Sequence, residues 1–160
     1  MSVEPSVRSQ AIRDLIRPWE VADLWETTNQ PVLWHQSTAE KVAAWLKQQF
    51  ERHELFYARD PPGIDMWCPP SATRLRRCGD CEDHSILAAS LIEAGSRIVP
   101  SVAVGTYCKE DVCLGHAWVE GIDEHGWFLL EATTGDLFRS GRPARYRLDQ
   151  LLSRTGRFAM

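Results

Sequence analysis

Two strand-like runs joined by a short polar segment place the strongest constraint on the fold of this chain. Residues 115–122 and 127–133 are rich in aliphatic and aromatic side chains, and the polar sequence DEHG fills residues 123–126. A short polar segment that ends in glycine is typical of a β-hairpin turn. If the turn has an even number of residues, Ile122 pairs with Trp127, and the two runs become adjacent antiparallel strands.

Helix-forming patterns come before this hairpin. Residues 6–17 predict a short helix, which Pro18 ends. Ser37 and Glu40 have the spacing of a capping box, and the apolar residues that follow fall on one face of a second helix. The proline-rich residues 57–70 then predict a loop, and long loops often carry substrate sites.

A third helix is expected between Asp80 and Gly95. Asp80 can serve as its N-cap, and Gly95 stands where helices commonly stop. Residues 98–105 follow as a further β-rich run. Helices that precede an antiparallel sheet indicate the α+β fold class.

The length of the chain favours one domain. With 160 residues the chain can bury a core of its own, and we expect a single domain over residues 1–160. We expect its core at about residues 38–136, with an N-terminal helical extension (1–37) and a basic C-terminal segment (137–160). No apolar run reaches the roughly 18 residues of a membrane helix, and residues 1–13 lack the apolar part of a signal peptide. The expected location is therefore the cytoplasm.

The basic C-terminal segment contrasts with the formal net charge of -4 for the whole chain. From Leu137 onward there are six arginines and one acidic residue, Asp149. Such a segment can hold a phosphate, a membrane surface or an acidic partner. The simpler interpretation is a solvated helix and tail docked on the acidic body of the chain. The net charge itself gives no sign of specific nucleic-acid binding.

The chain contains five cysteines, an odd number for a sequence without an export signal. They are Cys68, Cys78, Cys81, Cys108 and Cys113. A disulfide framework is therefore not expected, and metal binding or catalysis is the better hypothesis.

Cys81 lies at the start of the third predicted helix, where a cysteine can act as a nucleophile. The attacking species is the thiolate, and the unpaired N–H groups of a first helical turn lower the pKa of a thiol. The same N–H groups can bind the oxyanion of an attacked carbonyl. Glu82 and Asp83 act in the opposite direction because nearby negative charge disfavours a thiolate. We expect Asp83 to cap or brace the helix rather than to react.

The predicted hairpin supplies a partner for Cys81. In the even register His116 faces Thr133 and Trp118 faces Glu131, so His116 and Glu131 lie diagonally on one face. A carboxylate in that position fixes the tautomer of an imidazole and stabilises its cation. An odd turn would place Glu131 on the opposite face.

Three sequence segments resemble the motifs of the transglutaminase-like superfamily, whose core is papain-like. They are RCGDCEDHSIL at residues 77–87, GHAWVE at 115–120 and WFLLEAT at 127–133. In that superfamily a Gly-Asp-Cys segment opens the nucleophile helix, a His-Ala-Trp-Val segment supplies the base, and a strand ending in Asp-Pro-Thr supplies the acid. The resemblance covers roughly residues 38–133.

The resemblance implies a nucleophile helix packed on an antiparallel sheet. Cys81 would attack an amide carbonyl, His116 would move the proton and Glu131 would orient His116, with a thioester acyl-enzyme as intermediate. The favoured function is a cysteine peptidase or hydrolase that acts on a protein or peptide. The alternative is a protein-glutamine acyltransferase with an amine acceptor. This chemistry requires no cofactor, and no metal ligand is assigned.

The chain departs from the superfamily pattern at two positions. Glu131 stands where aspartate is usual, so the distance from His116 to the acid must be adjusted by one methylene. Cys78 stands where glycine or another small residue is common. Two tryptophans, Trp67 and Trp118, are the candidates for an oxyanion or substrate-cleft role.

Two rival hypotheses use the same cysteines. Cys78 and Cys81, together with Cys108 and Cys113, could supply four thiolates to a structural zinc ion. Alternatively, Cys78 and Cys81 form the Cys-x-x-Cys pair of a redox module. Within the enzyme hypothesis, Cys78 is a candidate redox partner that forms a reversible disulfide with Cys81. A third hypothesis is a binding scaffold that has lost the activity.

Overall fold

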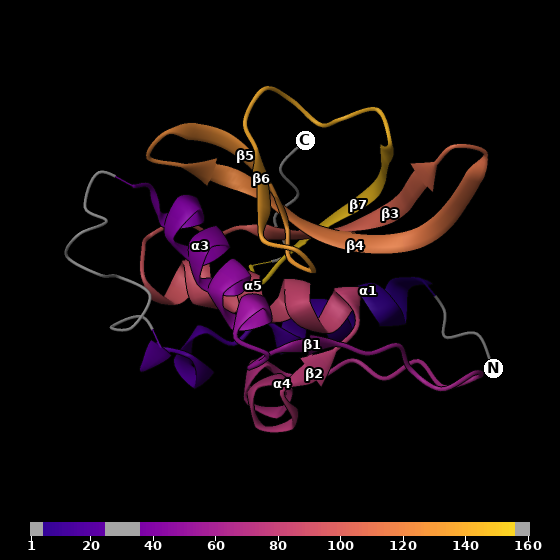
Figure 1. Ribbon diagram of the computed structural model, residues 1–160, viewed down its shortest axis with the longest axis horizontal. Helices are drawn as coiled ribbons and strands as arrows, with labels where there is room; N and C mark the ends of the chain where they lie inside the picture. The colour runs from indigo at the N-terminus through magenta and orange to yellow at the C-terminus, as the bar shows by residue number, and fades with distance from the viewer. Residues whose placement is uncertain (1–4, 25–35, 156–160) are drawn as a thin grey trace.

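The computed structural model describes residues 5–24 and 36–155 of the chain. Helices lie on one side of a five-stranded sheet, and a two-stranded sheet lies beyond them (Figure 1). The helical elements are α1 (Pro5–Leu15), the 3-10 helix η1 (Pro18–Glu20), α3 (Thr38–Glu51), α4 (Pro70–Arg76) and α5 (Cys81–Ala94). The strands are β1 (Phe56–Tyr57) and β2 (Cys78–Gly79) in the small sheet, and β3 (Ser101–Lys109), β4 (Val112–Asp123), β5 (Gly126–Glu131), β6 (Asp136–Phe138) and β7 (Tyr146–Ser153) in the large one. This order confirms the predicted α+β class.

Capping boxes fix the starts of the two central helices, where the sequence predicts a capping box at Ser37 and an N-cap at Asp80. At α3 the side chain of Ser37 accepts from the N–H of Glu40, and the Glu40 carboxylate accepts from the N–H of Ser37. At α5, Asp80 and Asp83 exchange the same two kinds of bond. Helix α5 ends at its C-cap Gly95. Asp83 therefore braces the start of the helix, as expected.

The β4–β5 hairpin has the predicted register. Ile122 pairs with Trp127, and the pair Asp123 and Gly126 closes the turn. The strand order in the large sheet is β6-β5-β4-β3-β7, and each neighbouring pair is antiparallel. The turn is therefore even, which is the condition that brings His116 and Glu131 to one face of the sheet.

Proline residues set two element boundaries. The loop expected at residues 57–70 spans residues 58–69, and α4 begins at Pro70, whose fixed φ suits the first turn of a helix. Strand β3 begins at Ser101, later than expected, directly after Pro100. Proline has no N–H to donate to a ladder, so a strand start is the position it tolerates best.

Helix α5 forms the centre of the core. Each residue from Cys81 to Ile92 is buried, and the helix packs against β4 and β3. A helix that is buried all round is stabilised by apolar contacts on every side. A second cluster on the sheet consists of Ala103, Trp118, Leu129 and Tyr146. Within residues 5–24 and 36–155, no helix is both long and apolar enough to cross a membrane.

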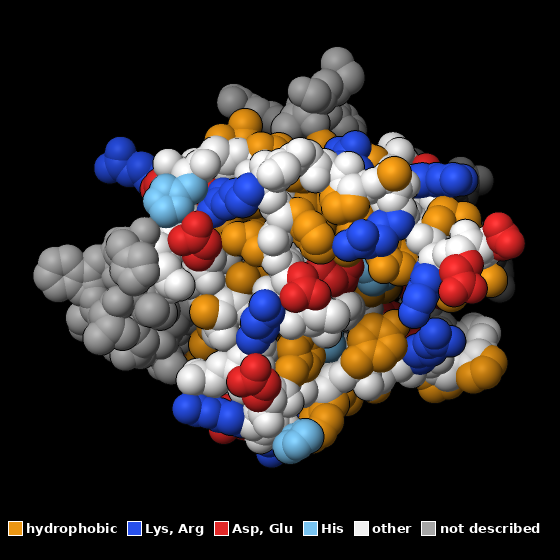
Figure 2. All heavy atoms as spheres, turned by 45° about the horizontal axis from the view of Figure 1, so that its top comes forward, with side chains coloured by type: hydrophobic (Ala, Val, Ile, Leu, Met, Phe, Trp, Pro, Cys, Tyr) orange, Lys and Arg blue, Asp and Glu red, His pale blue; other side chains and the backbone are white. Residues whose placement is uncertain are grey.

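The basic C-terminal segment forms strands β6 and β7 instead of the expected helix, because β7 pairs with β3 along most of its length. Three of its arginines nevertheless dock on acidic residues of the same chain, as the simpler interpretation predicted. Basic and acidic side chains are interspersed on the face in Figure 2. The ion pairs are Arg139–Asp123 (2.7 Å), Arg142–Glu120 (2.7 Å) and Arg154–Glu93 (2.6 Å). Residues 156–160 lie outside the described part.

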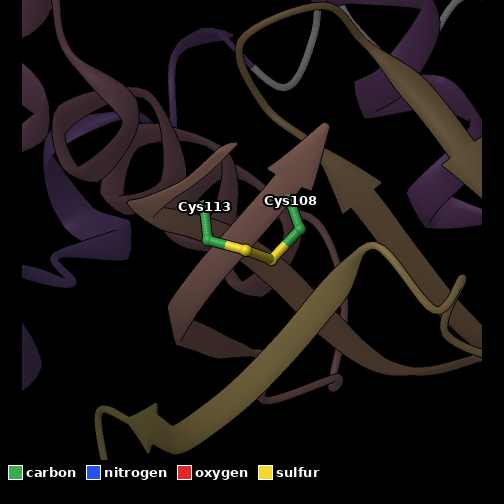
Figure 3. Close-up of a disulfide and its surroundings, with 2 residues drawn as sticks. All are labelled: Cys108 and Cys113. Atoms are coloured by element: carbon green, nitrogen blue, oxygen red, sulfur yellow. A yellow bond between two sulfur atoms is a disulfide. The ribbon is translucent and has the colours of Figure 1, made fainter. Parts of the chain in front are cut away.

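Cys108 and Cys113 form a disulfide, which corrects the expectation from the odd cysteine count (Figure 3). The two residues are directly opposite each other on β3 and β4. The disulfide uses two of the four thiolates that the zinc hypothesis requires, so that hypothesis is wrong. Cys68, Cys78 and Cys81 are free thiols.

Candidate active site

Cys81 is the first residue of α5 and lies in a nearly enclosed position. Its exposed fraction is 7 %. Strand β2 pairs with β1 and leads the chain into the helix through Gly79. A Cβ at Gly79 would lie 2.6 Å from the Cβ of Asp83, so only glycine allows this close approach. The local backbone thus places the thiol at the helix N-terminus, as the sequence predicts.

His116 and Glu131 make the contact that the hairpin register predicts. Nε2 of His116 lies 2.8 Å from Oε2 of Glu131, a normal hydrogen-bond distance despite the extra methylene of glutamate. The imidazole side chain is 18 % exposed and the carboxylate side chain 8 %. Because Nε2 is engaged by the carboxylate, Nδ1 is the ring nitrogen that remains for a reacting group.

Two further donors hold Glu131. Oγ1 of Thr133 donates to Oε1 at 2.7 Å, and the hydroxyl of Tyr146 donates to Oε2 at 2.8 Å. Burial by itself raises the pKa of Glu131, but hydrogen bonds from His116, Thr133 and Tyr146 outweigh it and lower the pKa below its ordinary value. Glu131 is therefore a stable anion beside the imidazole. Tyr146 was missed at the sequence level because no motif marks it.

Cys81 and His116 line one cleft of about 540 Å³. This volume is in the range of pockets that bind small molecules or a few residues of a peptide. Tyr57 and Arg59 form another part of the lining, and Arg8 of α1 reaches the cleft from the side of the N-terminal helix. The cleft therefore brings together elements that are far apart in the sequence.

The environment of Cys81 holds the thiol in its protonated form. Burial raises its pKa, and the carboxylates of Glu82 and Asp80 raise it further, against a backbone hydrogen bond from Ala117 that lowers it. The thiol donates to Oε2 of Glu82 at 3.4 Å, and Arg8 makes an ion pair with the other oxygen of the same carboxylate. Burial is therefore the largest cause of the raised pKa, and the neighbouring acids act in the direction expected from the sequence.

The structure has counterparts among solved proteins, although no protein-family model and no curated protein sequence matches the chain. It is similar to calcium-bound LapG from Legionella pneumophila, with a TM-score of 0.57 and 17% sequence identity over 86% of this chain and 77% of LapG. The chain has the transglutaminase-like fold. Its papain-like core and antiparallel sheet are the architecture that the three sequence motifs imply.

Two other solved structures show weaker similarity. The periplasmic domain of TgpA from Pseudomonas aeruginosa, bound to ethylmercury, has a TM-score of 0.48 and 21% identity over 84% of this chain and 46% of that domain. A candidate cysteine protease from Cytophaga hutchinsonii has a TM-score of 0.46 and 20% identity over 59% of this chain and 31% of that protein. The chain thus spans less than half of either structure.

The two candidate tryptophans do not line the cleft in this transglutaminase-like fold. Trp118 is fully buried, packs 5.1 Å from the ring of Tyr146 and donates its indole N–H to Glu120, which corrects the expected cleft role. It shares the face of His116 but lies deeper in the aromatic cluster. Trp67 packs against Arg8, whose guanidinium is 5.4 Å from the indole centroid and which itself lines the cleft.

Cys78 lies on β2 and is half-buried. Both Cys78 and Cys81 are free thiols in the structure. The hypothesis that they form a reversible disulfide therefore stays a prediction.

Acidic side chains crowd the start of α5. Ligand atoms of Asp60, Asp80 and Asp83 lie within 4.8 Å of one another, and those of Asp80, Cys81 and Glu82 form a second such group. Carboxylate oxygens prefer hard cations such as calcium, so this is the part of the described chain that could hold a metal. Burial raises the pKa of Asp80 to about 8, and the charges of Glu82 and Asp83 contribute to the same shift.

Proposed function

We propose that this chain is a cysteine hydrolase of the transglutaminase-like type that cleaves an amide bond in a peptide or protein. The observation that carries the proposal is the 2.8 Å contact between His116 and Glu131, beside a cleft that His116 shares with Cys81. A nucleophile, a base and a group that orients the base are the parts that thiol catalysis requires. The fold supports the same reaction class.

The reaction would begin with transfer of the Cys81 proton to Nδ1 of His116, while Glu131 balances the charge of the imidazolium. The thiolate attacks the amide carbonyl, and the tetrahedral intermediate expels the amine, which takes the proton from His116. A thioester on Cys81 remains. Water then attacks the thioester with His116 as base, and a carboxylic acid and the free thiol are released.

The resting thiol is compatible with this sequence of steps. Burial and neighbouring carboxylates keep Cys81 protonated in the resting chain. Its proton therefore has to move to His116 when the sulfur attacks the substrate. His116 then acts as a general base rather than as half of a permanent ion pair. The imidazole therefore acts in the formation of the thioester as well as in its hydrolysis.

The start of α5 offers one backbone donor for the oxyanion. The N–H groups of Glu82 and Asp83 donate to Oδ1 of Asp80 at 3.1 Å and 3.2 Å, so the cap already uses them. The N–H of Cys81 is the first-turn donor that remains. It lies in the nucleophile itself, where it can follow the developing charge on the attacked carbonyl.

Trapping of the acyl-enzyme tests the proposal. The protein is incubated with a peptide library, quenched in acid and digested, and mass spectrometry locates any adduct. We expect an acyl group on Cys81 of the wild-type chain, none at this position in Cys81→Ala, and an unchanged yield in Cys68→Ala, which removes another buried free thiol. A library that is cleaved equally well by Cys81→Ala would overturn the proposal.

The same experiment separates hydrolysis from acyl transfer. A fluorescent primary amine is added to the incubation, and its covalent incorporation into peptides is measured. Release of free acid with no amine incorporation supports a peptidase. Incorporation that competes with water would identify the protein-glutamine acyltransferase alternative, which uses the same acyl-enzyme.

A further inference from the structure

The hydroxyl of Tyr146 binds the same oxygen of Glu131 that binds the imidazole. The phenol donates to Oε2 at 2.8 Å, and Nε2 of His116 lies 2.8 Å from this atom. The Tyr146 ring is 5 % exposed and packs 5.1 Å from the rings of Tyr107 and Trp118. A hydroxyl held this firmly has one orientation in which to donate.

The carboxylate of Glu131 is held at both oxygens. Thr133 donates to Oε1, while His116 and Tyr146 share Oε2. Glutamate has one more rotatable bond than the aspartate usual in this superfamily, so its carboxylate needs more contacts to stay in one plane. The hydroxyls of Thr133 and Tyr146 supply those contacts, one at each carboxylate oxygen.

A β-bulge brings Tyr146 to this place. Val104 pairs with Gln150 but Gly105 pairs with Leu148, so one extra residue, Asp149, is inserted into β7. Bulges reverse the alternation of side chains and often re-aim a side chain near a site. If the register ran on without a bulge, Asp149 would pair with Gly105, and the position opposite Tyr107 would hold Arg147 instead of Tyr146.

The bulge also explains why residue 105 is glycine. A Cβ at Gly105 would lie 2.0 Å from the carbonyl oxygen of Arg147. Only glycine lets the two backbones come this close. The contact between Gly105 and Arg147, the bulge and the aromatic cluster therefore all help to position the hydroxyl of Tyr146.

We propose that Tyr146 is a positioning residue, whose hydrogen bond to Glu131 fixes the carboxylate and, through it, holds the imidazole of His116 with Nδ1 free for Cys81. The inference rests on the proposed thiol chemistry. It extends the site from three residues to four and makes strand β7 of the C-terminal segment a part of it.

The test compares Tyr146→Phe with the wild-type chain and with Tyr107→Phe. Both variants remove one hydroxyl and keep an aromatic ring, but only the first removes a bond to Glu131. The rate of Cys81 alkylation by iodoacetamide is followed by peptide mass spectrometry across pH. We expect Tyr146→Phe to slow alkylation about fivefold, whereas Tyr107→Phe changes the rate by less than about twofold.

The acid side of the pH profile gives a readout that a purely structural role would not move. The bond from Tyr146 lowers the pKa of Glu131, so its removal should let Glu131 take up a proton at higher pH. We expect the acid limb of the alkylation profile to move up by about 0.5 pH unit. An unmoved limb together with an unchanged rate would overturn the proposal.

A double-mutant cycle with Glu131→Asp completes the test. Aspartate is shorter by one methylene, so its carboxylate loses reach to the phenol. Tyr146→Phe should therefore have almost no effect in the Glu131→Asp background, whereas a packing role for Tyr146 would give additive losses.

Near-ultraviolet circular dichroism of each variant monitors the packing. If wild-type Cys81 reacts like an ordinary thiol and His116→Ala makes no difference, it is the proposed function that fails. A wild-type chain that depends on His116 but not on Tyr146 would overturn only the role of Tyr146.

Discussion

The two halves of the candidate site differ in how they treat their carboxylates. The nucleophile half, Asp80 to Asp83 at the start of α5, gathers acids whose charges repel one another, and burial together with the charges of Glu82 and Asp80 raises the pKa of Cys81. The acid–base half, His116 with Glu131, Thr133 and Tyr146, gives its one carboxylate a donor at each oxygen and lowers its pKa. The acids of the nucleophile half repel one another, whereas the carboxylate of the acid–base half has a hydrogen-bond donor at each oxygen.

This difference assigns separate roles to the two halves. A satisfied carboxylate keeps its geometry without substrate, so the acid–base half is preorganised. In the proposed mechanism, the protonated thiol becomes reactive only when its proton moves to His116. Reactivity at Cys81 should therefore depend on the acid–base half far more than on the helix N-terminus alone.

The largest effect is expected from removal of the base. His116→Ala should slow alkylation of Cys81 at neutral pH about 100-fold, because His116 is the one imidazole among the described residues that line the cleft, and a carboxylate such as Glu82 is a weaker base. His125→Ala is the matched control, since His125 is an exposed histidine paired with Glu40. Equal rates in the two variants would show that the halves are not coupled.

The second largest effect is expected from removal of one negative charge in the nucleophile half. Glu82→Gln removes a negative charge that raises the pKa of Cys81, so alkylation at neutral pH should become about tenfold faster. Glu93→Gln, which removes a charge at the other end of α5, should leave the rate unchanged. A slower reaction in Glu82→Gln would mean that the ion pair with Arg8 matters more than the charge.

The sequence predicts the acid–base half better than its surroundings. The even turn at residues 123–126 could be recognised because polar residues and a glycine mark it, and the Ile122–Trp127 register then follows from alternation. The capping boxes at Ser37 and Asp80 are equally local patterns. Such features involve residues a few positions apart, which is why sequence patterns indicate them.

Strand β7 and the role of Tyr146 were not predicted because they depend on pairing between distant parts of the chain. Strand β7 pairs with β3 across about 40 to 50 positions of the chain and carries a bulge, so neither the strand nor the direction of the Tyr146 side chain follows from local patterns. The β3–β4 turn was also hidden. Its left-handed residue is Glu110 (φ 56) rather than glycine or asparagine. The sequence therefore did not indicate a turn here, and the pairing of Cys108 with Cys113 was not predicted.

The third effect is the opposite pH response of the two halves. The pKa of Asp80 is raised from 3.8 to about 8, so in this window the folded chain binds a proton that the unfolded chain releases. The free energy of unfolding should therefore fall as pH rises from 4 to about 8. Glu131 has a lowered pKa, and its stabilisation is lost instead as pH falls below its ordinary value of 4.5.

Thermal unfolding between pH 5 and pH 8 measures the first of these responses. Asp80→Asn keeps a side chain that can cap α5 but cannot ionise. We expect its midpoint to change with pH by about 4 °C less than that of the wild-type chain. Asp14→Asn, at an exposed position on α1, controls for loss of one charge. A wild-type chain whose midpoint rises steadily over this range would contradict the assignment.

The smallest effect is expected from the disulfide, which lies at the far end of the β3–β4 hairpin. Cys108→Ser with Cys113→Ser opens a short loop whose ends the strand ladder already holds together, so the free energy of unfolding should fall by only about 1 kcal/mol. Chemical denaturation measures this loss. The rate of Cys81 alkylation should stay unchanged, because the β3–β4 ladder holds His116 without the disulfide, and the other contacts to Glu131 come from Thr133 after β5 and Tyr146 of β7. A slower rate would show that the acid–base half depends on the closed hairpin, and that a reducing environment weakens the site.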